Sequence, residues 1–431
     1  MPPMTRATLA LAVLVLAGCA DAPTGAGDPI SAGTEFRQVP TDTPAGCPTG
    51  TTGAAGALPG SGALYLICVP AGFDPATGSL VAYAPGSVPP QLPLVIRDDE
   101  IDGASVSEIV TGLGLAFATT SYRANGLIIV EGTRDLQRLV ARFRELYGPL
   151  GGEAYGIGVS EGAQVVVLAT ERHPQLFDGA LAACGPIGDF QRQLNYYGDF
   201  RLAFELFYGP ALAPALAQLG IENLGTPTEV PEEVVQAFGT PAAPGPLGAA
   251  IAQVIITQPA LTNAFLAALG LPIQLDASNQ ALVVETVLRV LAYSFLYGND
   301  ARETLGGNPY DNVAPTDYPR LIDGLPVPSI QGDQPALRHV AAKYETSGRL
   351  TAPLVTLFNT FDPIVPAWHE EVYRTKVQAA GAEDFLVAQI PVQRFGHCEF
   401  TRTEVLLAFG ALIQAVTGEP LLPAPAVAHG G

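Results

Sequence analysis

The stretch that decides the fold reads YGIGVSEGAQVVVLA and covers residues 155–169. A short apolar run bounded by glycines predicts a buried strand over residues 153–159, and apolar residues at helical spacing predict a helix over 161–172. Ser160 lies at the joint, with a glycine two residues before it and another two residues after it. Because the chain has 47 glycines, the Gly-x-Ser-x-Gly pattern alone is weak. Between a strand and a helix, however, it is typical of a nucleophilic serine on a strained turn.

The surrounding chain alternates between strand and helix patterns. Such alternation predicts the α/β class, with a mostly parallel central sheet flanked by helices. In this first half we expect a helix over 131–147 and strands over 63–69, 79–84, 92–96, 115–121 and 179–183.

A helical block interrupts this rhythm. We expect helices around 195–208, 247–269 and 280–297, and then a return to strand, helix, strand and helix at 353–358, 369–379, 385–392 and 404–416. The sequence therefore predicts a core in two halves, 61–188 and 347–418, with a helical cap inserted at 189–346. Tyr196, Tyr197, Phe204 and Phe207 are candidates to line a pocket under this cap, or else to form its core.

The N-terminus has the features of an export signal. Arg6 precedes an apolar run over residues 7–17, too short to span a membrane, and the run ends in Leu-Ala-Gly-Cys19. This resembles a bacterial lipobox, which implies a signal peptide at 1–18, lipidation of Cys19 and a membrane-anchored protein of the cell envelope facing the periplasm or the exterior. The alternative is an ordinary cleaved signal. No later run of eighteen uninterrupted apolar residues occurs.

The sequence predicts irregular structure at both ends of the mature chain. Residues 19–60 are rich in Gly, Pro, Thr and Ala without an apolar period, which predicts a flexible tether, and residues 419–431 predict a disordered tail. The net charge of −20 argues against nucleic acid as a partner and fits the solubility of an exported protein.

A nucleophilic serine needs a basic imidazole, and the chain has only 5 histidines. His173 ends the helix after the serine, and His429 is in the tail. His339 lies at the return from cap to core, and His369 is expected on a helix surface. His397 remains, in a loop after a late strand and before the last helix, where its ring can reach a nucleophile.

The imidazole in turn needs a carboxylate to orient it. The segment LVTLFNTFDPIVP places Asp362 at the tip of the preceding strand. Two prolines follow within four residues and stop the strand, which predicts a tight turn. The chain order of the candidates is Ser160, Asp362 and His397. Taken singly, Asp362 could be only a turn residue and His397 only a loop residue.

The motifs GVSEG, FDPIVP and FGHCEF, in this order, resemble those of the α/β-hydrolase superfamily. The resemblance spans both halves of the core but not the cap. It implies that Ser160 attacks a carbonyl carbon, that His397 takes up and returns the proton, and that Asp362 holds the imidazole.

An oxyanion hole made of two backbone N–H groups is also implied. One would belong to Glu161, and the other to Gly86 or Ser87, since Pro85 has no N–H. Many members have a His-Gly motif at this loop, and this chain has Pro-Gly instead. The side chain of Glu161 is expected in the first turn of its helix, where the dipole favours an anion; the alternative is that it points inward and stabilises positive charge on His397.

Four cysteines remain if Cys19 carries lipid, and four allow three pairings in an oxidising compartment. Two of them would lie at the carboxyl edge of the sheet. In tannase-like esterases a cysteine beside the serine bonds one beside the histidine, but here Val159 precedes the serine and the motif is incomplete. The preferred pairing is Cys47 with Cys68 and Cys184 with Cys398; the alternative for the second pair is two free thiols.

The sequence has no H-x-H, H-E-x-x-H or C-x-x-C motif and no phosphate-binding loop, so we expect neither a metal nor a cofactor. The expected function is a serine hydrolase that cleaves small or medium carboxylic esters through an acyl-enzyme. One alternative is a serine peptidase of the prolyl-oligopeptidase type. Another is a non-catalytic binding lipoprotein that keeps the fold.

Overall fold

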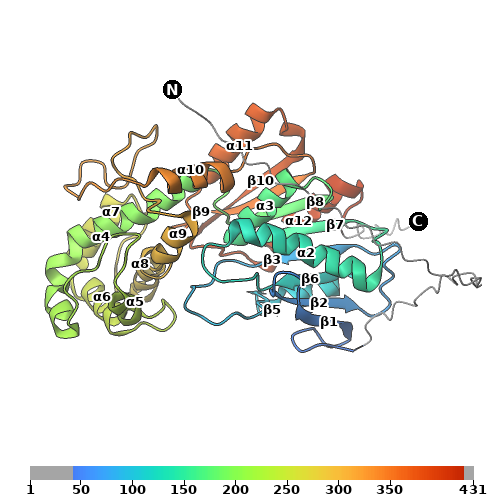
Figure 1. Cartoon of the computed structure of the whole chain (residues 1–431), viewed down its shortest axis with the longest axis horizontal. Helices are drawn as coiled ribbons and strands as arrows, with labels where there is room; N and C mark the ends of the chain where they lie inside the picture. The colour runs from blue at the N-terminus through green and yellow to red at the C-terminus, as the bar shows by residue number, and fades with distance from the viewer. Residues whose placement is uncertain (1–41, 422–431) are drawn as a thin grey trace, which may run out of the picture. The chain divides into compact units, whose positions relative to one another are not determined.

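A computed structural model of the chain describes residues 42–421. The predicted signal peptide, the lipidation site Cys19, most of the predicted tether and most of the predicted tail lie outside the described residues. Within them, Figure 1 shows one large sheet with helices packed against it and a separate group of helices, α4 to α9.

The large sheet has eight strands in the order β1-β2-β6-β3-β7-β8-β9-β10. Strand β2 runs antiparallel to both of its neighbours, and all other pairs are parallel. This confirms the predicted α/β class with a mostly parallel sheet. The strands are β1 Thr51–Ala57, β2 Leu64–Pro70, β3 Leu80–Ala84, β6 Ala116–Thr120, β7 Ala154–Val159, β8 Gly179–Ala183, β9 Leu354–Phe361 and β10 Leu386–Phe395.

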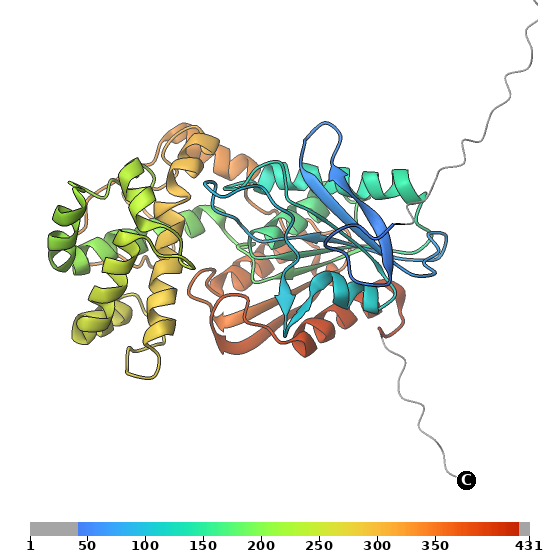
Figure 2. The ribbon, with the colours of Figure 1, turned by 90° about the horizontal axis from the view of Figure 1, so that it is seen from below.

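Helices cover both faces of this sheet, as Figure 2 shows. Alternate residues of each strand point to opposite faces, so Leu80 and Ala82 of β3 belong to one apolar cluster and Val81 and Tyr83 to another. The first cluster includes α2 Ile129–Tyr147, α3 Glu161–Arg172 and α11 Trp368–Ala380; the second includes α1 Val106–Gly112 and α12 Arg402–Thr417.

Five of the helices between β8 and β9 in the chain bury their own apolar cluster, which includes Phe200, Phe265 and Val287. They are α4 Phe190–Leu219, α5 Glu232–Phe238, α6 Pro246–Thr257, α7 Pro259–Ala268 and α8 Gln280–Phe295. Two further helices, α9 Gly298–Leu305 and α10 Gln334–Lys343, bury Leu305, Ala336 and Val340 in the first cluster of the sheet instead.

Two of these helical segments have the length and mean hydropathy of a membrane span: Phe190–Leu219 with 1.2 and Gln280–Leu305 with 1.4. Both supply residues to the apolar cluster of the cap, for example Phe204 and Leu291. Their apolar character is therefore used at least in part for packing the cap.

The structure differs from the sequence-based prediction at the start of the core. Residues 51–57 of the predicted tether form β1, which pairs with β2 along its whole length. A disulfide between Cys47 and Cys68 fastens the same segment to β2. The strand consists of Thr, Gly and Ala, so it has no apolar period from which it could be predicted.

Two further elements were also predicted incorrectly. Residues 92–96 form no strand; a short hairpin follows them instead, β4 Glu100–Ile101 with β5 Ala104–Ser105. The single helix predicted over 247–269 is two helices that meet at 98°, because Pro259 cannot continue the first helix and starts the second.

Candidate active site

Ser160 occupies the sharp turn between β7 and α3 with φ 55° and ψ −123°, a left-handed conformation that is costly for a residue other than glycine. Its N–H donates to the carbonyl oxygen of Ala183 at 2.9 Å. A Cβ on Gly158 would lie 2.1 Å from the carbonyl oxygen of Gly162, and one on Gly162 would lie 2.0 Å from that of Ala84. Both glycines are therefore needed for the turn to close.

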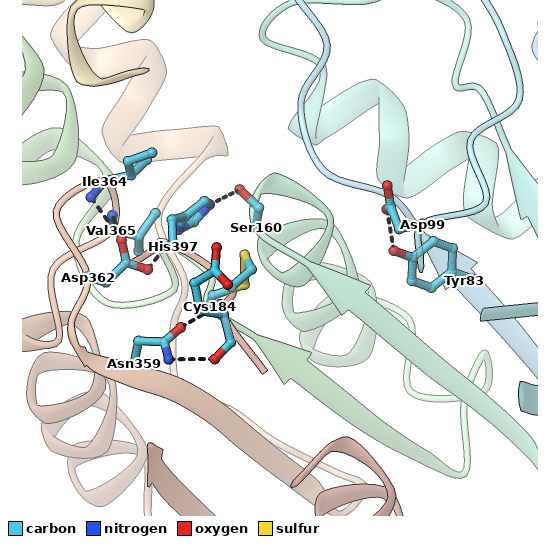
Figure 3. The surroundings of a disulfide bond; sticks show 11 residues. Tyr83, Asp99, Ser160, Cys184, Asn359, Asp362, Ile364, Val365 and His397 are labelled. Atoms are coloured by element: carbon cyan, nitrogen blue, oxygen red, sulfur yellow. Dashed lines mark hydrogen bonds and ion pairs between the residues drawn. A yellow bond between two sulfur atoms is a disulfide. The ribbon is translucent and has the colours of Figure 1, made fainter. Parts of the chain in front are cut away.

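The structure brings the three predicted residues together from separate turns (Figure 3). The Oγ of Ser160 lies 2.8 Å from Nε2 of His397, and Nδ1 of His397 lies 2.7 Å from Oδ2 of Asp362. A proton on Nδ1 is thus shared with the carboxylate, which leaves Nε2 free to accept the serine proton.

The acid is fixed by its own turn and by the cap. Oδ1 of Asp362 accepts the N–H groups of Ile364 at 2.8 Å and Val365 at 3.0 Å. From α4 of the cap, Gln193 Nε2 donates to the carbonyl oxygen of Ile364 at 2.8 Å and Tyr196 Oη donates to that of Pro363 at 2.5 Å. The carboxylate oxygen that faces His397 is therefore held from two sides.

Asn359, at the end of β9, ties the histidine loop to the sheet. Its Nδ2 donates to the carbonyl oxygen of Glu399 at 3.0 Å, and its Oδ1 accepts the N–H of Glu399 at 2.9 Å. The sequence analysis missed this residue, because an asparagine in a strand has no signal until its partner is known.

Two disulfides join the four cysteines in the preferred pairing, Cys47–Cys68 and Cys184–Cys398. The second lies beside the site (Figure 3) and links the residue after β8 to the residue after His397. Cys184, Cys398 and His397 are the only group in residues 42–421 with metal-like spacing. With its sulfurs joined to each other, this group has no thiolate to offer a metal.

The loop after β3 approaches the nucleophile closely. A Cβ on Gly86 would lie 3.2 Å from Cβ of Ser160. Arg97 donates from Nη1 to the carbonyl oxygens of Gly86 and Ser87, both at 3.2 Å, and its Nη2 pairs with Asp99 at 2.5 Å.

The same contacts orient the loop's amide groups. In a trans peptide the N–H points opposite to the C=O, so Arg97 directs the N–H of Ser87 away from itself. Within residues 42–421, no hydrogen bond engages the N–H groups of Gly86 and Ser87. The N–H of Glu161 belongs to the first turn of α3, where backbone donors have no partner inside the helix. The N–H groups of the predicted donors Gly86 and Ser87 thus have no hydrogen-bond partner in the described residues.

The side chain of Glu161 does not act on its own helix as expected. Oε1 accepts the N–H of Ile128, the N-terminal cap residue of α2, at 3.2 Å, and Oε2 is buried without a hydrogen-bond partner in the described chain. Burial raises the pKa of Glu161 to about 8, against the opposing effect of the Ile128 N–H. The expected negative charge at the start of α3 is thus absent, because the Glu161 carboxyl is largely protonated at neutral pH.

His369 also differs from expectation, because it is 1% exposed and not on the helix surface. Its Nδ1 accepts the N–H of Gly188 at 3.0 Å, and its Nε2 lies 2.6 Å from Oε1 of Gln193. Burial lowers the pKa of His369 well below its ordinary value. A neutral ring therefore joins α11 to the beginning of the cap.

Ser160 lies where two cavities meet. The larger has a volume of about 320 Å³, is lined by His397 and runs between α1 and α12 past apolar residues such as Val110 and Phe409. The smaller has a volume of about 70 Å³ and lies under the cap. Of the four cap aromatics proposed as lining, Tyr197 contributes to the smaller cavity, whereas Phe204 is fully buried in the cap core.

A scan against models of protein families and a search of curated proteins found no match. Among solved structures, feruloyl esterase B from Aspergillus oryzae is similar with a TM-score of 0.46 and 13% identity, over 86% of this chain and 82% of that one. An acylaminoacyl peptidase from Pyrococcus horikoshii has a TM-score of 0.40 and 9% identity over 80% of this chain, which spans 37% of the peptidase. A puromycin hydrolase has a TM-score of 0.39 and 12% identity, over 85% of this chain and 39% of the hydrolase.

These likenesses concern the arrangement of the chain and not its substrate. The mostly parallel sheet, the helices on both faces and the serine at a strand-to-helix turn are the features of the α/β-hydrolase fold. The fold predicted from the three motifs is therefore the fold observed.

Proposed function

We propose that this protein is a serine hydrolase that cleaves carboxylic esters through an acyl-enzyme on Ser160. The observation that carries the proposal is the unbroken chain of hydrogen bonds from Ser160 through His397 to Asp362. A buried imidazole aligned in this way can act as general base and then as general acid.

In the first half of the reaction, Oγ of Ser160 forms a bond to the carbonyl carbon while its proton moves to Nε2 of His397. The resulting oxyanion is stabilised by the N–H groups of Glu161 and of Gly86 or Ser87. The bond to the alcohol oxygen then breaks, and His397 returns the proton to that oxygen. Water, deprotonated by His397, releases the acid and restores the serine in the second half.

Two features support small or medium esters as the substrates. The nucleophile lies at the meeting point of two cavities of limited volume, not on an open surface. The larger cavity is mainly apolar, which suits an uncharged alcohol group. Cleavage of folded proteins would need an open groove.

We further propose that the protein is exported and anchored by lipid at Cys19 in a bacterial cell envelope, facing the periplasm or the exterior. The lipobox-like sequence supports the anchor, and the two disulfides support an oxidising compartment. The net charge of −20 supports the proposal that nucleic acid is not a partner.

The test is hydrolysis of p-nitrophenyl acetate, butyrate and octanoate by the full chain, by Ser160→Ala and by Ser278→Ala, an exposed serine of the cap. We expect Ser160→Ala to lose at least about 10³-fold in kcat/KM and Ser278→Ala to match the unaltered protein. A fluorophosphonate should label Ser160 alone. Equal turnover by all three proteins, or labelling that survives Ser160→Ala, would refute the proposal.

A further inference from the structure

The position of His397 distinguishes the two cavities that meet at Ser160. His397 lines the larger cavity and does not line the smaller one. Since His397 must protonate the departing alcohol oxygen, the alcohol part of an ester leaves through the larger cavity. The acyl part, bonded to Ser160, then lies in the smaller cavity.

The smaller cavity is short. Its volume is about 70 Å³, and one water-sized group needs roughly 10 to 15 Å³, so it holds about five such groups. An acyl group with a few atoms beyond its carbonyl carbon fits, and a long chain does not.

The lining of this cavity contains an unsatisfied polar group. Glu161 is 8% exposed and lines the cavity, and its Oε2 has no hydrogen-bond partner in the described chain. No cation within residues 42–421 forms an ion pair with it. A buried carboxyl oxygen without a partner is costly, and a ligand that supplies a donor removes that cost.

The other groups facing this carboxyl also favour a donor or a cation. Asp300, whose Oδ2 accepts the N–H of Leu127, adds negative potential near Glu161. Tyr197, Tyr293 and Tyr297 form a stacked wall, with ring centroids 4.2 and 5.3 Å apart between successive rings. A carboxyl oxygen without a donor, with a second carboxylate nearby, favours a ligand that carries an ammonium group.

We propose that the smaller cavity binds an acyl group bearing an amine next to its carbonyl, so that preferred substrates are esters of small amino acids with bulky apolar alcohols. This inference rests on the proposed ester hydrolysis. The amine donates to Oε2 of Glu161 and lies against the tyrosine wall, and the amine and carboxyl share the proton between them.

The test compares two 2-naphthyl esters whose acyl groups have nearly the same shape, alanyl and isobutyryl. For each, kcat/KM is divided by the rate of spontaneous hydrolysis, which corrects for the greater reactivity of the alanyl ester. We expect the unaltered protein to prefer the alanyl ester at least tenfold. Glu161→Gln should reduce this ratio at least tenfold, while Glu233→Gln, an exposed carboxylate of the cap, should preserve it.

The outcomes separate this inference from the proposed function. Hydrolysis of the isobutyryl ester without a preference for the alanyl ester would overturn the amine site and leave the esterase in place. So would a preference that Glu161→Gln does not change. Even if Glu161→Gln does not fold, the ratio of corrected kcat/KM values for the alanyl and isobutyryl esters in the unaltered protein tests the amine site. Failure to cleave either ester would overturn the proposed function itself.

Discussion

Cys184 and Cys398 are covalently joined, and Cys398 directly follows His397, so the loop that positions the imidazole is fastened to the end of β8. Both cysteines have left-handed backbone angles, φ 49° and 59°, as does Ser160 with φ 55°. Three conformations that are costly for these residue types thus lie at one site. Such strain persists only where surrounding contacts hold it, and the disulfide is one of these contacts.

Replacing both cysteines by alanine should therefore lower kcat more than it raises KM. We expect a loss of about tenfold in kcat, because a 1 Å displacement of a catalytic group has effects of this order or larger. The bond closes a loop across a sequence separation of 214, so its removal should also cost about 5 kcal/mol in free energy of unfolding. Steady-state kinetics and urea unfolding measure the two effects.

The other disulfide is the matched control. Cys47–Cys68 spans a sequence separation of 21 at the far edge of the sheet. Its removal should cost about 3 kcal/mol and leave kcat unchanged in the protein that remains folded. Equal effects of both double variants on kcat would show that the disulfide beside His397 does not position the imidazole.

Asp362→Asn should lower kcat by about 10³- to 10⁴-fold, because an amide cannot hold the proton on Nδ1 of His397 as a carboxylate does. We expect the variant to fold, because an amide oxygen can still accept the N–H groups of Ile364 and Val365. Ester-hydrolysis kinetics measure the loss of kcat, and circular dichroism checks that the variant is folded. Asp323→Asn, an exposed aspartate of the cap, should have no effect; a similarly small effect of Asp362→Asn would remove Asp362 from the mechanism.

Arg97 should act as a positioning residue for the oxyanion loop. Without its bonds to the carbonyl oxygens of Gly86 and Ser87, the N–H of Ser87 is no longer held in its orientation. Arg97→Ala is expected to lower kcat by about 10²-fold with little change in KM, as loss of an oxyanion donor does. Arg97→Lys, which can still donate, should recover part of the rate.

A control for this variant is Arg134→Ala on the outer surface of α2, where the side chain is 58% exposed. A rise in KM at constant kcat in Arg97→Ala would assign Arg97 to substrate binding instead.

The raised pKa of Glu161, about 8, makes folding stability depend on pH. The folded state keeps a proton that the unfolded state releases near pH 4.5, so stability is lost as pH rises from there through 8, by up to about 1.4 kcal/mol per pH unit. Glu161→Gln removes this titration. Urea unfolding at pH 5, 7 and 9 should show that the free energy of unfolding of the variant rises relative to that of the unaltered protein by a few kcal/mol as pH rises. If the free energies of unfolding of Glu161→Gln and of the unaltered protein changed with pH in parallel, Glu161 would be ionised throughout. The control Glu233→Gln should show the same pH dependence as the unaltered protein.

The sequence predicted well those features that depend on neighbouring residues. The glycines around Ser160, the prolines after Asp362 and the loop after β10 determine local geometry, and local geometry in a parallel sheet brings strand ends together. The order of strands and helices gave the fold for the same reason.

The features that the sequence did not predict depend on distant partners. Strand β1 is defined by its pairing with β2 and by the Cys47–Cys68 bond, not by any apolar pattern of its own. The direction of Glu161 is decided by Ile128, and the burial of His369 by the first residues of the cap. Tertiary contacts of this kind override the local preference of a helix position.

The contacts from α4 to the turn of Asp362 have a consequence for engineering. Gln193 and Tyr196 belong to the first two turns of the cap, yet they hold the carbonyl groups that shape the acid turn. The cap is thus not an interchangeable module that can be exchanged to alter specificity. A chimera that takes its cap from another hydrolase should keep α4 through Tyr196 and place its junction beyond that residue.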